Sequence, residues 1–169
     1  EWSTDHPDTV ALMKGYSGLR EGYSGYYNSD DAGVIGETYE DDRLYTKEFV
    51  IGVEHEGSAV AYPFSVLDRA GIVNDDVGSL PIAVIFDSET AAARVYDRTV
   101  AGEVLDFGLW EEDQIVDSMT GSLWSIATGE AIEGPLKGSQ LSRVKSTAAF
   151  WFGWKDWFPN TVVYGELGP

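Results

Sequence analysis

The charge imbalance of this chain constrains its fold more than any other feature of the sequence. Its 169 residues include 29 Asp and Glu against 11 Lys and Arg, which gives a formal net charge of −18. At ordinary ionic strength such a surface repels itself and destabilises the compact state. Salt near 1 M shortens the Debye length to about 3 Å and removes that repulsion. Scarce lysine and dispersed acids therefore predict a protein adapted to concentrated salt, as found in haloarchaea.

The apolar content shows that the chain can nevertheless bury a core. Hydrophobic residues make up 43% of the sequence and aromatic residues 13%, which predicts one compact domain. Because phosphate binding needs many Lys and Arg side chains, the composition argues against a nucleic-acid partner. The longest apolar run, residues 148–154, is too short to cross a bilayer, so we expect no membrane insertion by this segment.

The sequence contains no cysteine, which excludes disulfides, thiolate metal sites and a catalytic thiol. The two histidines, His6 and His55, lie far apart without the ligand spacing of a zinc site. We therefore expect no cofactor, and a divalent cation on carboxylates remains the one open alternative. Since the first residue is Glu1 and not Met, we also expect a processed or excerpted product.

Alternating apolar residues and frequent Gly and Asp turns predict a mainly β (α+β) fold. We expect antiparallel sheets in a barrel-like or sandwich arrangement, with two or three short helices and a long N-terminal loop. Helices are predicted at 64–70 and 148–158, the second aromatic nearly all round and therefore buried. Trp110, beside three acids, is the one Trp expected near water. The predicted strands cover 49–53, 59–62, 82–86, 93–97, 103–107, 114–117, 122–126 and 140–145.

Three segments are expected along the chain. Residues 14–46 form a Gly-, Tyr- and Asp-rich ordered loop, and 47–169 form the β-rich domain. Residues 1–13 read as a tail that echoes 153–164, because Trp, Pro, Thr and Val recur at matching positions. The echo fits either two independent helix–stop–strand corners or a unit repeated within a larger protein, and we favour the repeat.

Several polar residues sit where predicted strands end, and they are the candidate site residues. The Asn74-Asp75 pair fits a turn, and residues 117–122 read as a hairpin turn that carries Trp124 into the core. A polar site is expected if the following side chains converge: Tyr62, Asn74, Asp75, Asp97, Arg98 and Asp117. The candidate ligands for a divalent cation are Asp75, Asp87 and Asp117.

Ordered motifs along nearly the whole chain carry a family resemblance. They occupy residues 52–53, 61–63, 72–75, 95–98, 120–124, 128–138, 150–154 and 158–161. Together they resemble the uncharacterised DUF3179 family. Many members look like two related halves, and this chain looks like the second half preceded by the last corner of the first.

One departure from that family bears on chemistry. The family's first-half pattern has a Tyr-Cys-Pro-x-Cys-Gly-Ser run before Phe-Asp-Arg, whereas Asp87 and Thr90 occupy the two Cys positions here. A thiol redox or soft-metal role implied by that Cys pair therefore cannot operate in this chain.

These observations predict an exported cell-surface or extracellular domain that acts by binding or assembly, with self-association, a protein partner or a glycan as candidate partners. No complete catalytic constellation is evident. The alternative hypothesis is a carboxylate-dependent hydrolase or a divalent-cation-binding domain. A third hypothesis is a structural relic that supports a Cys-containing half elsewhere.

Overall fold

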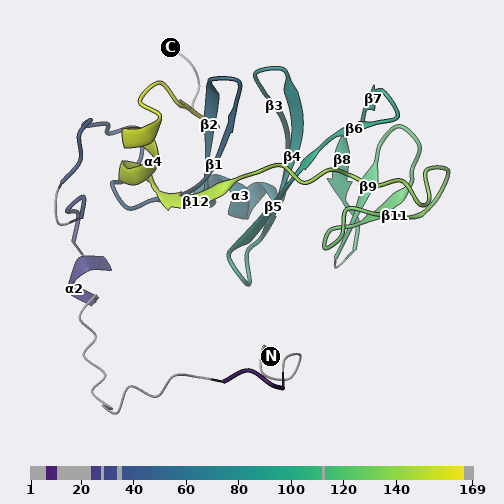
Figure 1. Ribbon diagram of the computed structural model, residues 1–169, viewed down its shortest axis with the longest axis horizontal. Helices are drawn as coiled ribbons and strands as arrows, with labels where there is room; N and C mark the ends of the chain where they lie inside the picture. The colour runs from purple at the N-terminus through teal and green to yellow at the C-terminus, as the bar shows by residue number, and fades with distance from the viewer. Residues whose placement is uncertain (1–6, 11–23, 28, 34–35, 112, 166–169) are drawn as a thin grey trace.

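The computed structural model describes residues 7–10, 24–27, 29–33, 36–111 and 113–165. These residues form a layered β structure with short helices (Figure 1). None of the described helices is long and apolar enough to cross a membrane.

The first layer is a four-stranded sheet, here called the terminal sheet, with strand order β12-β1-β2-β13. Strands β1 (Phe49–His55) and β2 (Ser58–Pro63) form an antiparallel hairpin, whose turn has positive φ at Glu56 and Gly57. Strand β12 (Thr147–Phe150) pairs antiparallel with β1, and β13 (Val162–Val163) pairs parallel with β2. The C-terminal segment thus supplies both edges of this sheet.

The second layer, the central sheet, contains β3 (Ile72–Val77), β4 (Leu80–Asp87) and β5 (Ala92–Asp97), all antiparallel. The middle strand β4 is apolar from Leu80 to Phe86 because both of its faces are buried. Ile82, Val84 and Phe86 pack toward the terminal sheet, in a cluster with residues of β1 and β2. Ala83 and Ile85, which alternate with them, pack against the third layer.

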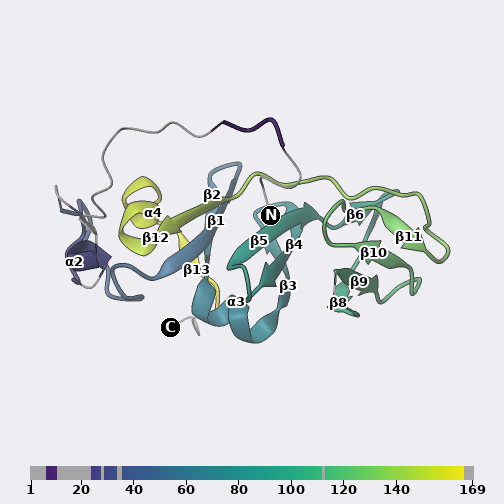
Figure 2. The same ribbon diagram turned by 90° about the horizontal axis from the view of Figure 1, so that it is seen from below.

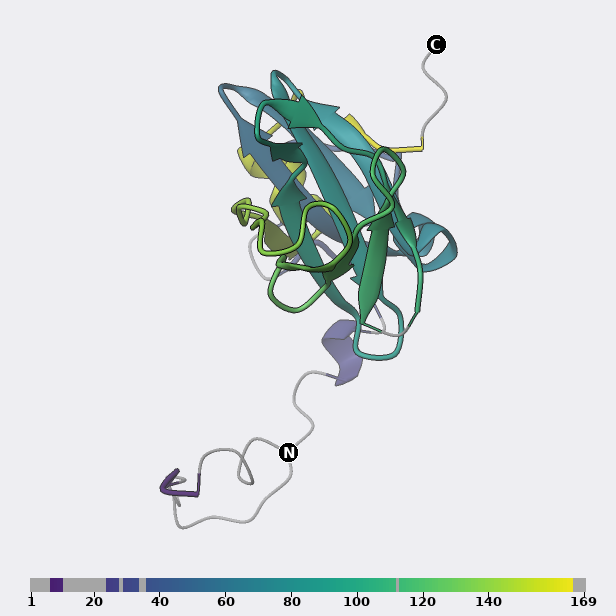
Figure 3. The ribbon, with the colours of Figure 1, turned by 90° about the vertical axis from the view of Figure 1, so that its right-hand side faces the viewer.

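The third layer, the distal sheet, has the order β11-β10-β9-β8. Its strands are β8 (Phe107–Leu109), β9 (Gln114–Asp117), β10 (Leu123–Ser125) and β11 (Ala131–Glu133). Trp124 is fully buried and meets the Phe107 ring edge-on, 5.7 Å between centroids. A two-stranded ribbon, β6 (Thr99–Val100) and β7 (Glu103–Val104), links the central and distal sheets. Figure 3 shows the molecule from the right-hand side of Figure 1, and in this view the distal sheet lies in front of the other layers.

Three short helices complete the described fold: α2 (Ser24–Tyr27), α3 (Phe64–Ala70) and α4 (Trp151–Trp157). Helix α4 covers the outer face of the terminal sheet, where Trp151 and Trp154 pack on Val50 and Ala61. The layers therefore follow one another as α4, terminal sheet, central sheet and distal sheet (Figures 1 and 2).

The mainly β class predicted from sequence is confirmed: the sheets are antiparallel except for the β2–β13 pair, and the described strands form no closed barrel. Helix 64–70 and strand 114–117 have the predicted bounds. The predicted strand 103–107 is wrong in extent, because the chain leaves β7 after Val104 and begins β8 only at Phe107. The strand predicted at 140–145 does not form. These residues run beside β5 and pair with it at one isolated β-bridge, between Tyr96 and Arg143.

Two further predictions are corrected by the structure. The helix expected at 148–158 begins only at Trp151, because residues 147–150 extend as β12 to pair with β1. That helix is not buried all round: Trp157 is 82% exposed, more than Trp110 at 58%. Of the tail expected at 1–13, the structure describes only residues 7–10. Of the loop expected at 14–46, it describes residues 24–27, which form α2, together with 29–33 and 36–46.

Candidate ligand-binding groove

Strand β3 carries three consecutive polar residues, Asn74, Asp75 and Asp76, and the turn predicted for the first two is wrong. Because side chains alternate along a strand, Asp75 shares a face with Val73 and Val77, which pack toward the terminal sheet. Asn74 and Asp76 lie on the opposite face, toward the distal sheet. The alternation therefore sends one carboxylate to each side of the central sheet.

Asp75 is held by a tyrosine of the neighbouring layer. The Tyr62 hydroxyl donates a hydrogen bond of 2.9 Å to Asp75 Oδ2 across the space between the two sheets. Burial, together with the charge of Asp75, raises the pKa of Tyr62 well above its usual value, so the phenol stays protonated and acts as a donor. This pair links two of the predicted site residues.

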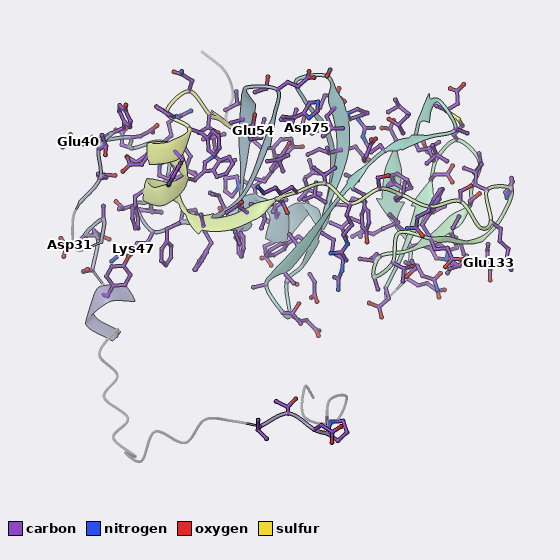
Figure 4. All side chains as sticks on the ribbon, in the orientation of Figure 1. Asp31, Glu40, Lys47, Glu54, Asp75 and Glu133 are labelled. Atoms are coloured by element: carbon purple, nitrogen blue, oxygen red, sulfur yellow. The ribbon has the colours of Figure 1, made fainter. Side chains whose placement is uncertain are left out.

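A groove of about 630 Å³ opens beside this pair, between β2–β13 and the rim of β3. Figure 4 labels Asp75 on β3, the strand that packs against the β1–β2 hairpin. Tyr164 is half-buried in the groove wall, with its ring centroid 5.3 Å from that of Tyr62. The remaining lining residues are Gly57, Ser58, Ala59, Val60, Asp75, Asp76, Gly78, Asn160, Val162, Val163 and Gly165.

Arg98 anchors the far side of β3. Its guanidinium donates to Asp106, to Asp76 Oδ1 at 3.3 Å and to the backbone oxygen of Asp75 at 3.3 Å. The side chain is only 8% exposed, so these partners compensate a charge that would otherwise be buried alone. Arg98 therefore fixes the strand that presents Asp75 to the groove.

Asn74 positions the same strand against the distal sheet. Its amide nitrogen donates to the Phe107 backbone oxygen at 2.8 Å, and its amide oxygen accepts from the Phe107 backbone nitrogen at 2.9 Å. Asn74 thus serves as a structural link and lies on the face of β3 opposite to Asp75.

The other predicted site residues lie elsewhere. Asp97 accepts a hydrogen bond from the Thr99 backbone at the start of β6. Asp87 closes the β4–β5 turn by accepting from Glu89 and Thr90. Of the six residues expected to converge, Tyr62 and Asp75 meet through their side chains, whereas Arg98 reaches only the backbone oxygen of Asp75 from the far side of β3. Asn74, Asp97 and Asp117 make their contacts elsewhere.

Asp117 organises the β9–β10 turn as the sequence predicted. It accepts hydrogen bonds from the Trp124 indole at 3.0 Å, from the Thr120 backbone at 2.6 Å and from the Ser122 backbone at 3.1 Å. Burial acts to raise its pKa, but these hydrogen bonds outweigh burial and hold the pKa below its usual value.

The candidate cation ligands Asp75, Asp87 and Asp117 occupy separate elements: β3, the end of β4 and the end of β9. Within the described ranges, no group of three His, Asp or Glu side chains is arranged to hold a metal ion.

Sequence reasoning missed three contributors to the groove: Ser58, Asn160 and Tyr164. Their positions follow from the parallel pairing of β13 with β2, which no local pattern reveals. One signal in the sequence did predict the position of Asp75. Val73, Asp75 and Val77 follow each other at every second position, which is the spacing of side chains on one face of a strand.

The fold and groove define an acidic, cysteine-free domain of stacked β-sheets with a groove at the rim of one interface. Residues 1–161 match the family model described as "Protein of unknown function (DUF3179)". The chain therefore belongs to the DUF3179 family.

A curated relative named "Protein disulfide-isomerase", from Aspergillus oryzae, is 31% identical over 122 residues. The match covers 69% of this chain and 24% of that relative, so the chain spans about a quarter of its length. Since this sequence has no cysteine, its own residues cannot perform thiol–disulfide exchange. No solved structure matches the chain.

Proposed function

We propose that this chain is a salt-adapted, exported binding domain that holds a neutral, hydroxyl-rich ligand, a glycan, in the groove between β2–β13 and β3. The observation that carries the proposal is the Asp75 carboxylate. One of its oxygens is held by Tyr62, while among the described residues Oδ1 accepts no hydrogen bond at the groove wall. A carboxylate fixed in this way accepts hydrogen bonds from ligand hydroxyls with little loss of side-chain entropy.

The lining supports a sugar more than a charged ligand. The half-buried Tyr164 offers an aromatic surface to the C–H face of a sugar ring, and Ser58 and Asn160 add hydroxyl and amide groups. Asp75 and Asp76 together with the net charge of −18 oppose an anionic ligand.

The described carboxylates whose pKa is displaced are Asp41, Asp87, Asp117 and Asp156, and all four lie outside the groove lining. Backbone or side-chain donors hold each pKa below its usual value, so these groups act as hydrogen-bond acceptors within the fold.

The proposal is tested by titrating the native chain in high salt with neutral mono- and oligosaccharides, followed by tyrosine and tryptophan fluorescence and by calorimetry. We expect Asp75→Asn and Tyr164→Ala to lose at least about tenfold in affinity. Asp87→Asn, which removes an exposed carboxylate outside the groove, should bind as the native chain does.

Saccharides that fail to bind the native chain would contradict the ligand class. Binding that Asp75→Asn and Tyr164→Ala leave intact would contradict the site. Adding Ca²⁺ and then a chelator covers the alternative in which a cation bridges ligand and carboxylate, since sugar binding by direct hydrogen bonds is independent of both.

A further inference from the structure

The central sheet carries a local basic surface on a protein that is acidic elsewhere. Residues 142–145 run antiparallel beside β5, through backbone hydrogen bonds from Asp97 N to Ser142 O and from Val144 N to Val95 O. The bridge between Tyr96 and Arg143 sets the register, which places Lys145 opposite Arg94. We call Arg94, Arg143 and Lys145 the basic strip.

This placement conflicts with the usual rule for sheets, because like charges directly across a strand pair destabilise it. Arg94 is partly buried, while Arg143 and Lys145 are exposed. Hydrogen bonds from Thr90 and Glu89 hold the pKa of Asp87 below its usual value, and the charge of Arg94 adds to them. Among the described residues, none of the three basic side chains takes part in a salt bridge.

Arg143 is held in position. Its Nη2 donates to the Ala127 backbone oxygen at 3.2 Å, and its guanidinium lies 5.6 Å from the centre of the Tyr96 ring. The strip therefore presents a fixed guanidinium beside two further cations.

Four of the six other basic residues that the structure describes are used internally. Arg43, Lys47, Arg98 and Lys155 bind carboxylates or backbone oxygens of the same chain. Local conflicts of this kind are expected where a surface serves recognition. We propose that the basic strip binds carboxylates of a second copy of this chain, so that copies associate through unlike surfaces.

The chain itself offers a complementary partner face. A hollow of about 1030 Å³ near the α4 end has six acids in its lining: Asp30, Glu37, Glu40, Asp41, Asp42 and Glu48. Asp41 and Glu37 are already paired with Arg43 and Lys155, so the remaining acids would meet a partner. Glu40 and Asp42 are exposed there, and Figure 4 shows Glu40 beyond α4, away from β5. We call this surface the acidic hollow.

Because strip and hollow are different surfaces, the contact is heterologous and extends head to tail. It does not depend on the groove or its ligand. The competing explanation is that charges on an exposed edge merely block unwanted strand pairing. That protective role would tolerate a change of sign, whereas binding to acids would not.

The test is sedimentation equilibrium of the native chain over about 10 µM to 1 mM. It is run at the lowest KCl concentration that retains the native circular dichroism spectrum, because salt screens such contacts. We expect weak association under this condition. The variants are compared with the native chain at the same KCl concentration, because salt screens both the contact between strip and hollow and the general repulsion between two copies of charge −18. Arg94→Glu with Lys145→Glu should reduce the association constant by about tenfold or more, as should Glu40→Lys with Asp42→Lys.

Mixing these two double variants should restore association, because each supplies the native surface that the other lacks. Lys137→Glu makes a change of the same sign on an exposed lysine outside the strip and should associate like the native chain. If charge reversal prevents folding, Arg94→Gln with Lys145→Gln takes its place.

A native chain that stays monomeric over the whole range would overturn the proposal. The proposal would also be overturned if Lys137→Glu lost as much association as the strip variant. A mixture of the two double variants that failed to associate would overturn it as well.

Discussion

The side chain of Asn74 makes both hydrogen bonds to the Phe107 backbone that a neighbouring strand would make, at 2.8 and 2.9 Å. A single amide thereby joins β3 of the central sheet to β8 of the distal sheet. It also fixes the strand that carries Asp75 on its other face. The integrity of the groove is thus coupled to the packing of the third layer.

We predict that Asn74→Ala destabilises the fold by about 1–3 kcal/mol, because the paired backbone groups of Phe107 lose both partners. Asn74→Asp keeps the acceptor but places a carboxylate oxygen against the Phe107 carbonyl, so it should rescue little stability. Hydrogen exchange checks this at one atom: the Phe107 amide should exchange faster in Asn74→Ala, which removes its acceptor. Unchanged protection of that amide would show that Asn74 does not hold the two sheets together.

Gly52 allows α4 to approach the terminal sheet. A Cβ built on Gly52 would lie 2.3 Å from the Trp154 ring, whereas a Cβ on Gly108 would meet nothing within 4 Å. We therefore predict that Gly52→Ala lowers the free energy of unfolding by about 1–3 kcal/mol through overpacking. Gly108→Ala is the matched control in a strand and should stay within about 0.5 kcal/mol. Denaturant unfolding measures the stability of both variants. If Gly52→Ala were as stable as Gly108→Ala, the Trp154 ring of α4 would not lie against Gly52.

The carboxylate of Asp117 should contribute to acid sensitivity. Its pKa is lower in the fold than the value of about 3.9 expected when unfolded, so its contribution is present above that value. This contribution is lost as the pH falls through the folded pKa. At neutral pH we expect Asp117→Asn to be about 1–3 kcal/mol less stable than the native chain, because the Trp124 indole loses a charged acceptor.

The stability difference between Asp117→Asn and the native chain should narrow as the pH falls from about 5 to 2. Unfolding curves across this range test the prediction. A difference that stays constant with pH would assign the loss to packing and not to the carboxylate.

The net charge predicts that the fold depends on salt. With −18 charges, repulsion should leave the chain unfolded or marginally stable near about 0.1 M KCl and stable in multi-molar KCl. Circular dichroism melts over this range measure the effect. Equal melting temperatures would mean that the acidic composition serves a purpose other than salt adaptation.

Local patterns predicted much of the fold. The apolar run of β4, the turn at Asp117 and the short helix ending before Gly71 all follow from side-chain chemistry within a few residues. The parts that sequence could not predict depend on distant partners. Residues 147–150 extend because β1 lies beside them, and Trp157 is exposed because α4 buries only one face.

The residues of the groove could likewise be predicted only in part, because their positions also depend on partners distant in sequence. A polar pair such as Asn74 and Asp75 predicts a turn because such pairs usually occur there, and only a partner on another layer stabilises the pair in a strand. Tyr62 supplies that partner for Asp75 and the Phe107 backbone supplies it for Asn74. Tyr164 and Asn160 reach the groove through a parallel pairing at long sequence separation.

Amide chemical-shift mapping in high salt tests most directly whether the groove beside Asp75 holds a hydroxyl-rich ligand. On addition of a neutral saccharide we expect shift changes concentrated at residues 57–60, 75–78 and 160–165, and none in Asp75→Asn at the same concentration. Shifts centred on Trp110 or Trp157, or no shifts with any neutral saccharide, would contradict this expectation.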